Sequence, residues 1–153
     1  MEVLKIKISD IYILDTEISG ISNESSIIKG FINEKISLSV KYWLLHLKKQ
    51  IKDILDIVNE IKVDLVKAYG QIDSEGNYVL PYYLDESETE INPNYTLFQE
   101  KFNSLLNEER ELTYMPIQFE EIQNIQTESV YIFILQNLIK IKWHNQKNYL
   151  TKN

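Results

Sequence analysis

The 153-residue sequence contains no cysteine and only four glycines, three prolines and two histidines. Without cysteine, the chain can form neither a disulfide, nor a thiolate metal site, nor a cysteine nucleophile. No glycine lies in a GxGxxG or GxxxxGK context, which excludes the common phosphate-binding loops. His46 and His144 stand apart, and neither lies at metal-ligand spacing from acids. We therefore predict no catalytic residue, no metal site and no cofactor.

Long apolar runs are also missing. The most apolar stretch, residues 130–135, is far shorter than the ~20 residues that cross a bilayer. The start MEVLKIKISD has no apolar core behind a basic leader, so it does not read as a signal peptide. We predict a soluble protein that is not secreted by a signal peptide and does not enter a membrane.

Charge is unevenly distributed along the chain. The net charge of −7 argues against a general nucleic-acid binder, which needs a surplus of basic side chains. Acids gather in DESETE (85–90) and NEERE (107–111), whereas the residues after Glu128 include four lysines and no acid. A charged partner would therefore meet either sign, depending on the end that it contacts. We expect no nucleic-acid partner.

The strongest periodic signal lies in residues 39–69. Apolar side chains recur there at alternating spacings of four and three: Val40, Leu44, Leu47, Ile51, Ile54, Val58, Ile61, Leu65 and Ala68. This spacing predicts one helix about 45 Å long with a narrow apolar seam, the pattern of coiled-coil packing. Such a seam needs a partner helix.

The partner helix is predicted at about 93–110, after a connector of residues 70–92. Asn92 is a good N-cap residue and Pro93 suits the first helical position. Its apolar positions are Tyr95, Phe98, Phe102, Leu105 and Leu112. The two helices would form an antiparallel hairpin. A homo-oligomeric coiled coil through the first seam is the competing interpretation.

Small β elements are predicted around this hairpin. Residues 3–8 alternate apolar and basic residues as in a strand, and its mate is residues 111–119, where Pro116 indicates an edge. A short helix between them ends at Gly20. A C-terminal helix is predicted at about 128–142 with Thr127 as cap, although residues 130–135 could equally form a buried strand. The fold class is a single domain, mainly α with a small β element (α+β).

The connector begins with a polar stretch, DSEGN, at residues 73–77. Its alternating oxygen side chains resemble a calcium loop, but an EF-hand needs glycine sixth and glutamate twelfth, where this chain has Tyr78 and Leu84. A tight turn, as in a small hairpin, is the better interpretation. Gly70 is expected to end the long helix in a left-handed conformation.

Aromatic residues mark the candidate contact sites. Tyrosine and tryptophan are enriched at protein interfaces because they bury a large area and keep a polar tip. Tyr82 and Tyr83 lie in the connector beside Asp85 and Glu86, and Trp143 lies among C-terminal lysines. We predict these five residues as protein-interface residues, although packing onto its own domain is the simplest role for Trp143.

Several segments together resemble small uncharacterised helical-hairpin proteins of bacteriophages and prophages. They are LKIKISDI, KISLSVKYWLLHLKKQI, KAYGQIDSEGNYVL and NPNYTLFQEKFNSLLNEERELTYMPI, followed by an apolar C-terminal helix. The resemblance covers most of the chain and implies a phage or prophage origin. It brings no catalytic residues. The acidic insertion YYLDESETEI departs from the compact connector of that group.

These observations favour a non-enzymatic phage-type protein that acts through protein–protein contacts, as a minor virion component or an assembly factor. Its partners would be phage structural proteins or a second copy of the chain, in the host cytoplasm or the virion. The alternative is a small acidic inhibitor of a host defence factor, with residues 85–90 and 107–111 mimicking nucleic acid. An enzyme is the third hypothesis.

Overall fold

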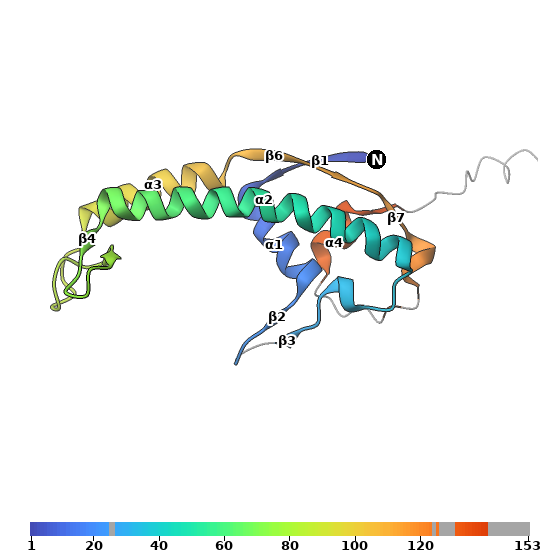
Figure 1. Cartoon of the computed structure of the whole chain (residues 1–153), viewed down its shortest axis with the longest axis horizontal. Helices are drawn as coiled ribbons and strands as arrows, with labels where there is room; N and C mark the ends of the chain where they lie inside the picture. The colour runs from blue at the N-terminus through green and yellow to red at the C-terminus, as the bar shows by residue number, and fades with distance from the viewer. Residues whose placement is uncertain (25–26, 124, 126–130, 141–153) are drawn as a thin grey trace, which may run out of the picture. The chain divides into compact units, whose positions relative to one another are not determined.

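The computed structural model describes residues 1–24, 27–123, 125 and 131–140. Its chain is mainly α with short two-stranded sheets, which confirms the predicted fold class (Figure 1). The helices are α1 (Ile8–Ser19), α2 (Leu38–Tyr69), α3 (Pro93–Leu106) and α4 (Ile132–Asn137), with 3-10 helices η1 (Phe31–Asn33) and η2 (Phe119–Ile122). The strands are β1 (Glu2–Lys7), β2 (Ile21–Ser22), β3 (Ile27–Ile28), β4 (Gln71–Ile72), β5 (Tyr78–Val79), β6 (Glu109–Tyr114), β7 (Ile117–Gln118) and β8 (Ile139–Lys140).

The chain divides into two compact units. The first unit comprises Met1–Leu4, Ile13–Lys49 and Glu111–Asn153, and the second comprises Lys5–Tyr12 and Gln50–Arg110. Helices α1 and α2 and the paired strands β1 and β6 each contribute residues to both units. The single domain indicated by the sequence stays a prediction.

Helix α2 forms where the apolar spacing predicted it. Ser37 caps its start, because its Oγ accepts a hydrogen bond from Val40 N at 3.2 Å. The helix then runs for 32 residues without a proline or glycine. Burial along its predicted seam is uneven. Five seam residues are buried: Val40, Leu44, Leu47, Ile51 and Val58. The later ones, Ile61, Leu65 and Ala68, are half-buried or exposed.

A close backbone crossing shapes the first unit. Helix α1 ends at Ser19, and Gly20 follows it, as predicted, with a left-handed φ of 83°. A Cβ on Gly20 would lie 2.3 Å from Ile28 O, and one on Gly30, whose φ is 87°, would lie 2.6 Å from Ser19 O. The two segments approach this closely because neither residue has a side chain.

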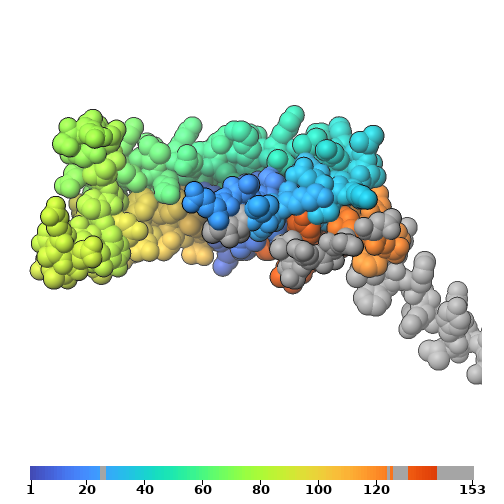
Figure 2. All heavy atoms as spheres, turned by 90° about the horizontal axis from the view of Figure 1, so that it is seen from below, coloured from blue at the N-terminus to red at the C-terminus, as the bar shows by residue number. Residues whose placement is uncertain are grey.

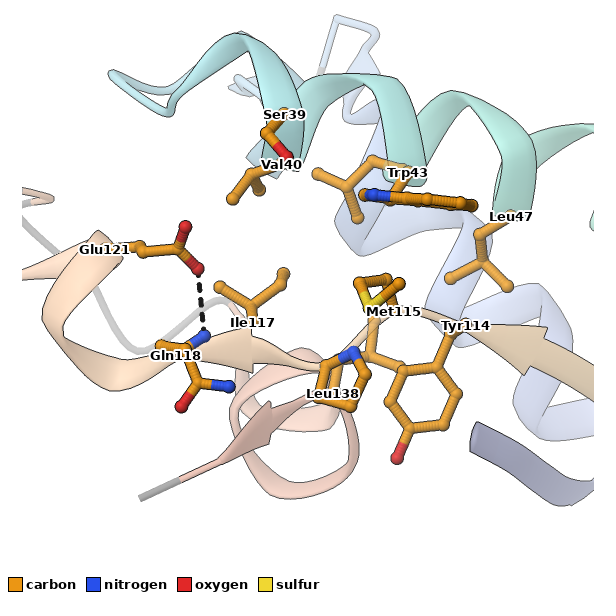
Figure 3. A pocket seen from close by; sticks show the side chains of 12 residues that line it. Ser39, Val40, Trp43, Leu47, Tyr114, Met115, Ile117, Gln118, Glu121 and Leu138 are labelled. Atoms are coloured by element: carbon orange, nitrogen blue, oxygen red, sulfur yellow. Dashed lines mark hydrogen bonds between the residues drawn. The ribbon is translucent and has the colours of Figure 1, made fainter. Parts of the chain in front are cut away.

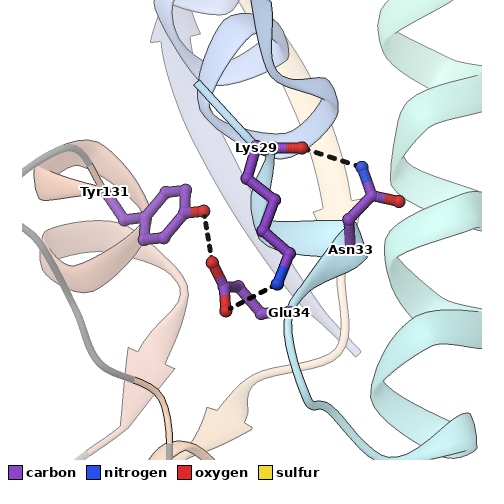
Figure 4. Close-up of polar contacts among 4 residues, drawn as sticks. All are labelled: Lys29, Asn33, Glu34 and Tyr131. Atoms are coloured by element: carbon purple, nitrogen blue, oxygen red, sulfur yellow. Dashed lines mark hydrogen bonds and ion pairs between the residues drawn. The ribbon is translucent and has the colours of Figure 1, made fainter. Parts of the chain in front are cut away.

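Polar contacts hold the last described segment of the first unit. The hydroxyl of Tyr131 donates to Glu34 at 2.9 Å, and Lys29 forms an ion pair with the same carboxylate at 3.6 Å (Figure 4). The ring of Tyr131 also meets that of Phe31 edge-on at 5.2 Å. Buried Glu17 accepts hydrogen bonds from the backbone N–H groups of residues 133 and 134, both at 2.9 Å. The carboxylate of Glu17 therefore caps α4.

The C-terminal helix is shorter than predicted. Residues 128–130 and 141–142 and the proposed cap Thr127 lie outside the described residues, and α4 spans only Ile132–Asn137. Helix geometry stops there because β8 pairs in parallel with β7, Ile139 opposite Ile117, and Ile117 N donates to Leu138 O at 2.9 Å. The alternative of a strand over 130–135 is wrong for its described part, since 132–135 are helical.

The predicted strand at 111–119 is confirmed as two pieces. Strand β6 pairs with β1, as expected from the sequence, and β7 follows after Met115 and Pro116. Proline lacks the N–H that a continuous ladder requires, which explains the break. Helix α3 consequently ends at Leu106 and not near residue 110, because 109 and 110 already belong to β6.

Most of the second unit is a helical hairpin. Figure 1 shows α3 running back along the C-terminal half of α2. Asn92 and Pro93 begin α3 as predicted, and the Asn92 side chain accepts from Asn94 N at 3.0 Å. Lysine ammonium groups face rings across the pair, Lys62 over Phe102 at 5.6 Å and Lys101 over Tyr69 at 5.5 Å. Each such cation–π contact contributes about 0.5–1 kcal/mol at exposed sites.

Candidate interaction surface

The first half of the connector is a hairpin. Strands β4 and β5 pair antiparallel, with Gln71 opposite Val79 and Ile72 opposite Tyr78, as the turn chemistry predicted. Asp73 holds the turn: its Oδ1 accepts from Glu75 N and Asn77 N, both at 2.9 Å. Local capping by a short acidic side chain is typical of such turns. The carboxylate of Asp73 is thus used by the backbone of its own loop.

Gly70 joins α2 to this hairpin in a way that the sequence did not predict. The expected left-handed conformation is wrong, since the glycines with positive φ are Gly20, Gly30 and Gly76. A Cβ on Gly70 would lie 2.4 Å from Val66 O and 2.5 Å from Val79 O. Glycine is needed here because the end of α2 and strand β5 approach each other closely, and not because of its φ.

The second half of the connector folds back on itself. Tyr83 bridges to Ile91, Leu84 N donates to Glu90 O at 3.0 Å, and Asn92 N donates to Tyr82 O at 2.8 Å. These antiparallel contacts bring the two ends of the acidic insertion together. At its turn, Asp85 Oδ1 accepts from Ser87 N at 3.0 Å and from the Ser87 hydroxyl. The loop therefore has a defined shape.

A line of aromatic rings ties this loop to α3. Centroids lie 4.7 Å apart between Tyr83 and Tyr82, 5.0 Å between Tyr82 and Tyr95, and 6.0 Å between Tyr95 and Phe98. Phe98 then stacks on Phe102 at 5.8 Å. Along this line, Tyr82 is 44% exposed and Phe98 is 9% exposed. Contacts of this kind hold the exposed tyrosine in place.

Exposed apolar side chains gather on the connector. Five large ones protrude from it: Ile72, Tyr78, Tyr82, Leu84 and Ile91. Exposed Glu86, Glu88 and Glu90 lie within the same loop as Leu84. Figure 2 shows the connector as two lobes, green and yellow-green, at the end of the α2–α3 hairpin. We call these eight residues the tip surface. Contact surfaces typically combine exposed apolar side chains with polar ones.

The structure places the five predicted interface residues in different settings. Tyr82 and Tyr83 are brought together, and Glu86 is exposed on the tip surface. Asp85 is used in its own turn, so its carboxylate is a structural group. Trp143 lies outside the described residues. The prediction missed Leu84 and Ile91, although alternation of apolar residues at 82 and 84 and their return at 91 carried the signal.

Outside the tip surface, we consider His46, possible metal ligands and possible membrane helices. His46 Nε2 lies 3.2 Å from the Tyr42 hydroxyl, one turn away on the exposed side of α2. Within the described ranges, no three histidine or acidic side chains are grouped as a metal ion requires. In the same part of the chain, none of the helices has the length and apolar character needed to cross a membrane.

Comparisons with known proteins give no relative. No family model matches the sequence, and no curated protein and no solved structure matches the chain.

Proposed function

We propose that the protein acts through contacts between its tip surface and another protein, as a minor virion component or an assembly factor of a bacteriophage. The observation that carries the proposal is that exposed apolar side chains lie in a connector loop of defined shape. Leu84 is 53% exposed and Tyr82 44% exposed, yet both lie in a loop closed by two backbone hydrogen bonds, which form the bridge between Tyr83 and Ile91. A preformed apolar surface binds a partner without the cost of ordering a loop.

Charge defines the partner further. The connector, residues 70–92, contains no lysine or arginine, and Glu86, Glu88 and Glu90 lie on the tip surface; the ammonium of Lys67 in α2 lies 5.9 Å from the ring centre of Tyr78. A complementary partner would therefore present an apolar patch with basic side chains around it. The phage setting comes from the resemblance described above. The proposed non-enzymatic role is supported by Asp73 and Asp85, because their carboxylates accept hydrogen bonds from backbone N–H groups of their own turns.

A test separates the apolar part of the surface from its charge. In one variant, Tyr82→Ser and Leu84→Ser remove two exposed apolar groups. In a second, Glu86→Gln and Glu90→Gln remove two charges and leave Asp85 to hold the turn. The matched control is Leu97→Ser, which removes an apolar group that is 45% exposed on α3, outside the tip surface. Each tagged full-length chain is used to capture proteins from infected cells, and purified virions are analysed by mass spectrometry.

An assembly role predicts that the protein is found in the particle or captures a phage structural protein. The double serine variant should lose at least about tenfold in affinity for that partner, because apolar groups at the centre of a contact dominate its energy. The Leu97→Ser control should bind as the unchanged chain does. Absence from virions together with no binding to any structural protein would contradict the proposal.

The second candidate is inhibition of a host defence factor by mimicry of nucleic acid. The fixed acidic loop at residues 85–90 favours it, because ordered carboxylates can imitate spaced phosphates. The other acidic segment is less suited, since Glu108 already forms an ion pair with Arg110 at 2.7 Å. Mimicry predicts that the two glutamine substitutions abolish inhibition and that the two serine substitutions have the smaller effect. The reverse order would rule it out.

A further inference from the structure

A pocket lies entirely within the first unit. It has a volume of about 180 Å³ and is bounded by the first turns of α2 on one side and by residues 114–118 on the other (Figure 3). Its inner walls are core residues: Val40, Leu44 and Leu47 from α2, with Ile117 and Leu138, all at most 5% exposed. Such walls are held by the packing of the unit, so the pocket is preformed.

Trp43 forms part of the α2 side of this pocket. Its indole meets the rings of Tyr42 at 5.1 Å and His46 at 5.5 Å. In Figure 3 it lies opposite Ile117 and Met115. Among the described residues, no group accepts a hydrogen bond from its Nε1–H. An indole N–H is a donor only and usually finds an acceptor when its ring is packed. Because no buried side-chain nitrogen or oxygen of the described residues lacks a hydrogen-bond partner, this N–H is open to solvent, and the pocket offers a donor that no group of the described chain uses.

Glu121 gives the pocket an acidic edge. One carboxylate oxygen accepts from Gln118 N at 3.0 Å, the reciprocal capping contact at the start of η2. In the described part of the chain, no lysine or arginine forms an ion pair with this carboxylate. Glu121 and its neighbour Glu120 are both exposed, but Glu120 does not line the pocket. The charge at this edge favours a cationic group on whatever binds there.

The size of the pocket decides between kinds of occupant. Drug-sized ligands occupy pockets of about 300–1,000 Å³, which is larger than this one. An apolar cavity of about 150 Å³ holds a single benzene ring. A volume of about 180 Å³ therefore fits one large side chain. One anchor residue inserted into such a pocket is the usual centre of a protein–peptide contact.

We infer that this pocket is a second contact site, which takes one large apolar side chain from a segment of a partner protein. A lysine or arginine beside that anchor contacts Glu121, and a backbone carbonyl of the segment accepts from Trp43 Nε1–H. The site lies in a different unit from the tip surface and does not depend on it. A protein with both would contact two partners, or two parts of one partner.

The probe for this site is a displayed library of random twelve-residue peptides, selected on the full-length chain. We expect enriched peptides to share a large apolar residue with a lysine or arginine one or two positions away. In a Trp143→Phe background, Trp43 is the only tryptophan. Binding of a synthetic enriched peptide should therefore shift the emission of Trp43, and the shift gives an affinity.

Three variants locate the binding. Ser39→Phe places a ring at the mouth from an exposed position and should abolish binding. Trp43→Phe removes the donor and the pyrrole part of the indole, and should weaken binding by at least roughly three- to tenfold, the effect of one hydrogen bond; calorimetry reports it. Glu121→Gln keeps an oxygen for Gln118 N and should weaken basic peptides roughly threefold, with little effect on peptides whose basic residue is replaced by glutamine.

Glu120→Gln is the matched control, because it removes the same charge one residue away. It should leave binding unchanged. The inference is overturned by a failure to select any peptide, by binding that survives Ser39→Phe, or by equal effects of Glu120→Gln and Glu121→Gln. Peptides that bind a Leu84→Ser chain as well as the unchanged chain separate this site from the tip surface, so that either proposal can fail alone.

Discussion

The same helix is covered differently in the two units. In the first unit, Leu44 and Leu47 of α2 are 3% and 1% exposed. In the second, Ile51 and Val58 are still buried, but the same apolar spacing then continues through Ile61 and Ala68, which are exposed, and Leu65, which is half-buried. Periodicity fixes which residues share a face of a helix. It does not fix how much of that face another element covers, and this is why one seam serves as core at one end and as surface at the other.

The polar contacts of the two units differ in the sequence distance between the residues that they join. In the first unit, carboxylates join residues far apart in sequence: Glu17 accepts from residues 133 and 134, and Glu34 accepts from Tyr131. In the second unit, Asp73 and Asp85 accept from groups two to four residues away. Long-range contacts close the first unit, whereas local contacts shape the loops of the second.

Leucine truncation in the two halves of α2 should show the largest difference. Leu47→Ala should lower the free energy of unfolding by about 2–5 kcal/mol, because it empties a fully buried site. Leu65→Ala should lower it by about 1 kcal/mol, since its side chain is only partly removed from water. Urea unfolding followed by circular dichroism measures both.

Equal losses for these two variants would contradict the comparison. They would mean that the C-terminal half of the seam is covered in solution, as in the homo-oligomeric coiled coil that the sequence left open. The loss for Leu65→Ala would then depend on protein concentration, which distinguishes an interface between copies from a buried core.

Two glycines with similar positive φ provide a second contrast. Gly30 in the first unit has φ 87°, and Gly76 in the second has φ 82°. A Cβ on Gly30 would lie 2.5 Å from Ser19 C, whereas one on Gly76 meets no atom within 4 Å. Gly30→Ala should cost about 2–4 kcal/mol, from the strained angle and the clash together. Gly76→Ala should cost about 1 kcal/mol, from the angle alone.

Thermal unfolding of the two alanine variants checks this prediction. Native-state hydrogen exchange then places the effect, which should appear at the end of α1 for Gly30→Ala and in β4 and β5 for Gly76→Ala. A Gly30→Ala chain as stable as the Gly76→Ala chain would show that the crossing at Ser19 can open at little cost.

Local signals predicted much of this fold. The start of α3 follows from Asn92 and Pro93, and the end of α1 from Gly20, because caps and breakers act within a few residues. The hairpin at β4 and β5 follows from the turn residues between Ile72 and Tyr78 in the same way. Elements whose ends depend on neighbours close in sequence are the ones that a single sequence can define.

Predictions were less accurate for elements whose ends depend on residues far away in the sequence. The end of α4 is set by pairing of Ile139 with Ile117, and its start is capped by Glu17, which lies more than a hundred residues earlier. The role of Gly70 depends on the approach of Val79 O. At the candidate site, the aromatic pair was predictable but the use of Asp85 in a turn was not, since a carboxylate in an acidic run appears free until the loop geometry is known.

The smallest contrast compares two carboxylates that each accept from two backbone N–H groups. Glu17 is buried, whereas Asp73 is not. Glu17→Gln leaves one acceptor oxygen and places an amide donor against an N–H, so stability should fall by about 1–3 kcal/mol. Asp73→Asn should lower it by less than about 0.5 kcal/mol, because water reaches the loop and asparagine also forms such turns. Thermal unfolding gives the losses, and faster hydrogen exchange at Phe133 and Ile134 would assign the first to α4. A loss for Asp73→Asn as large as that for Glu17→Gln would show that burial does not set the strength of these caps.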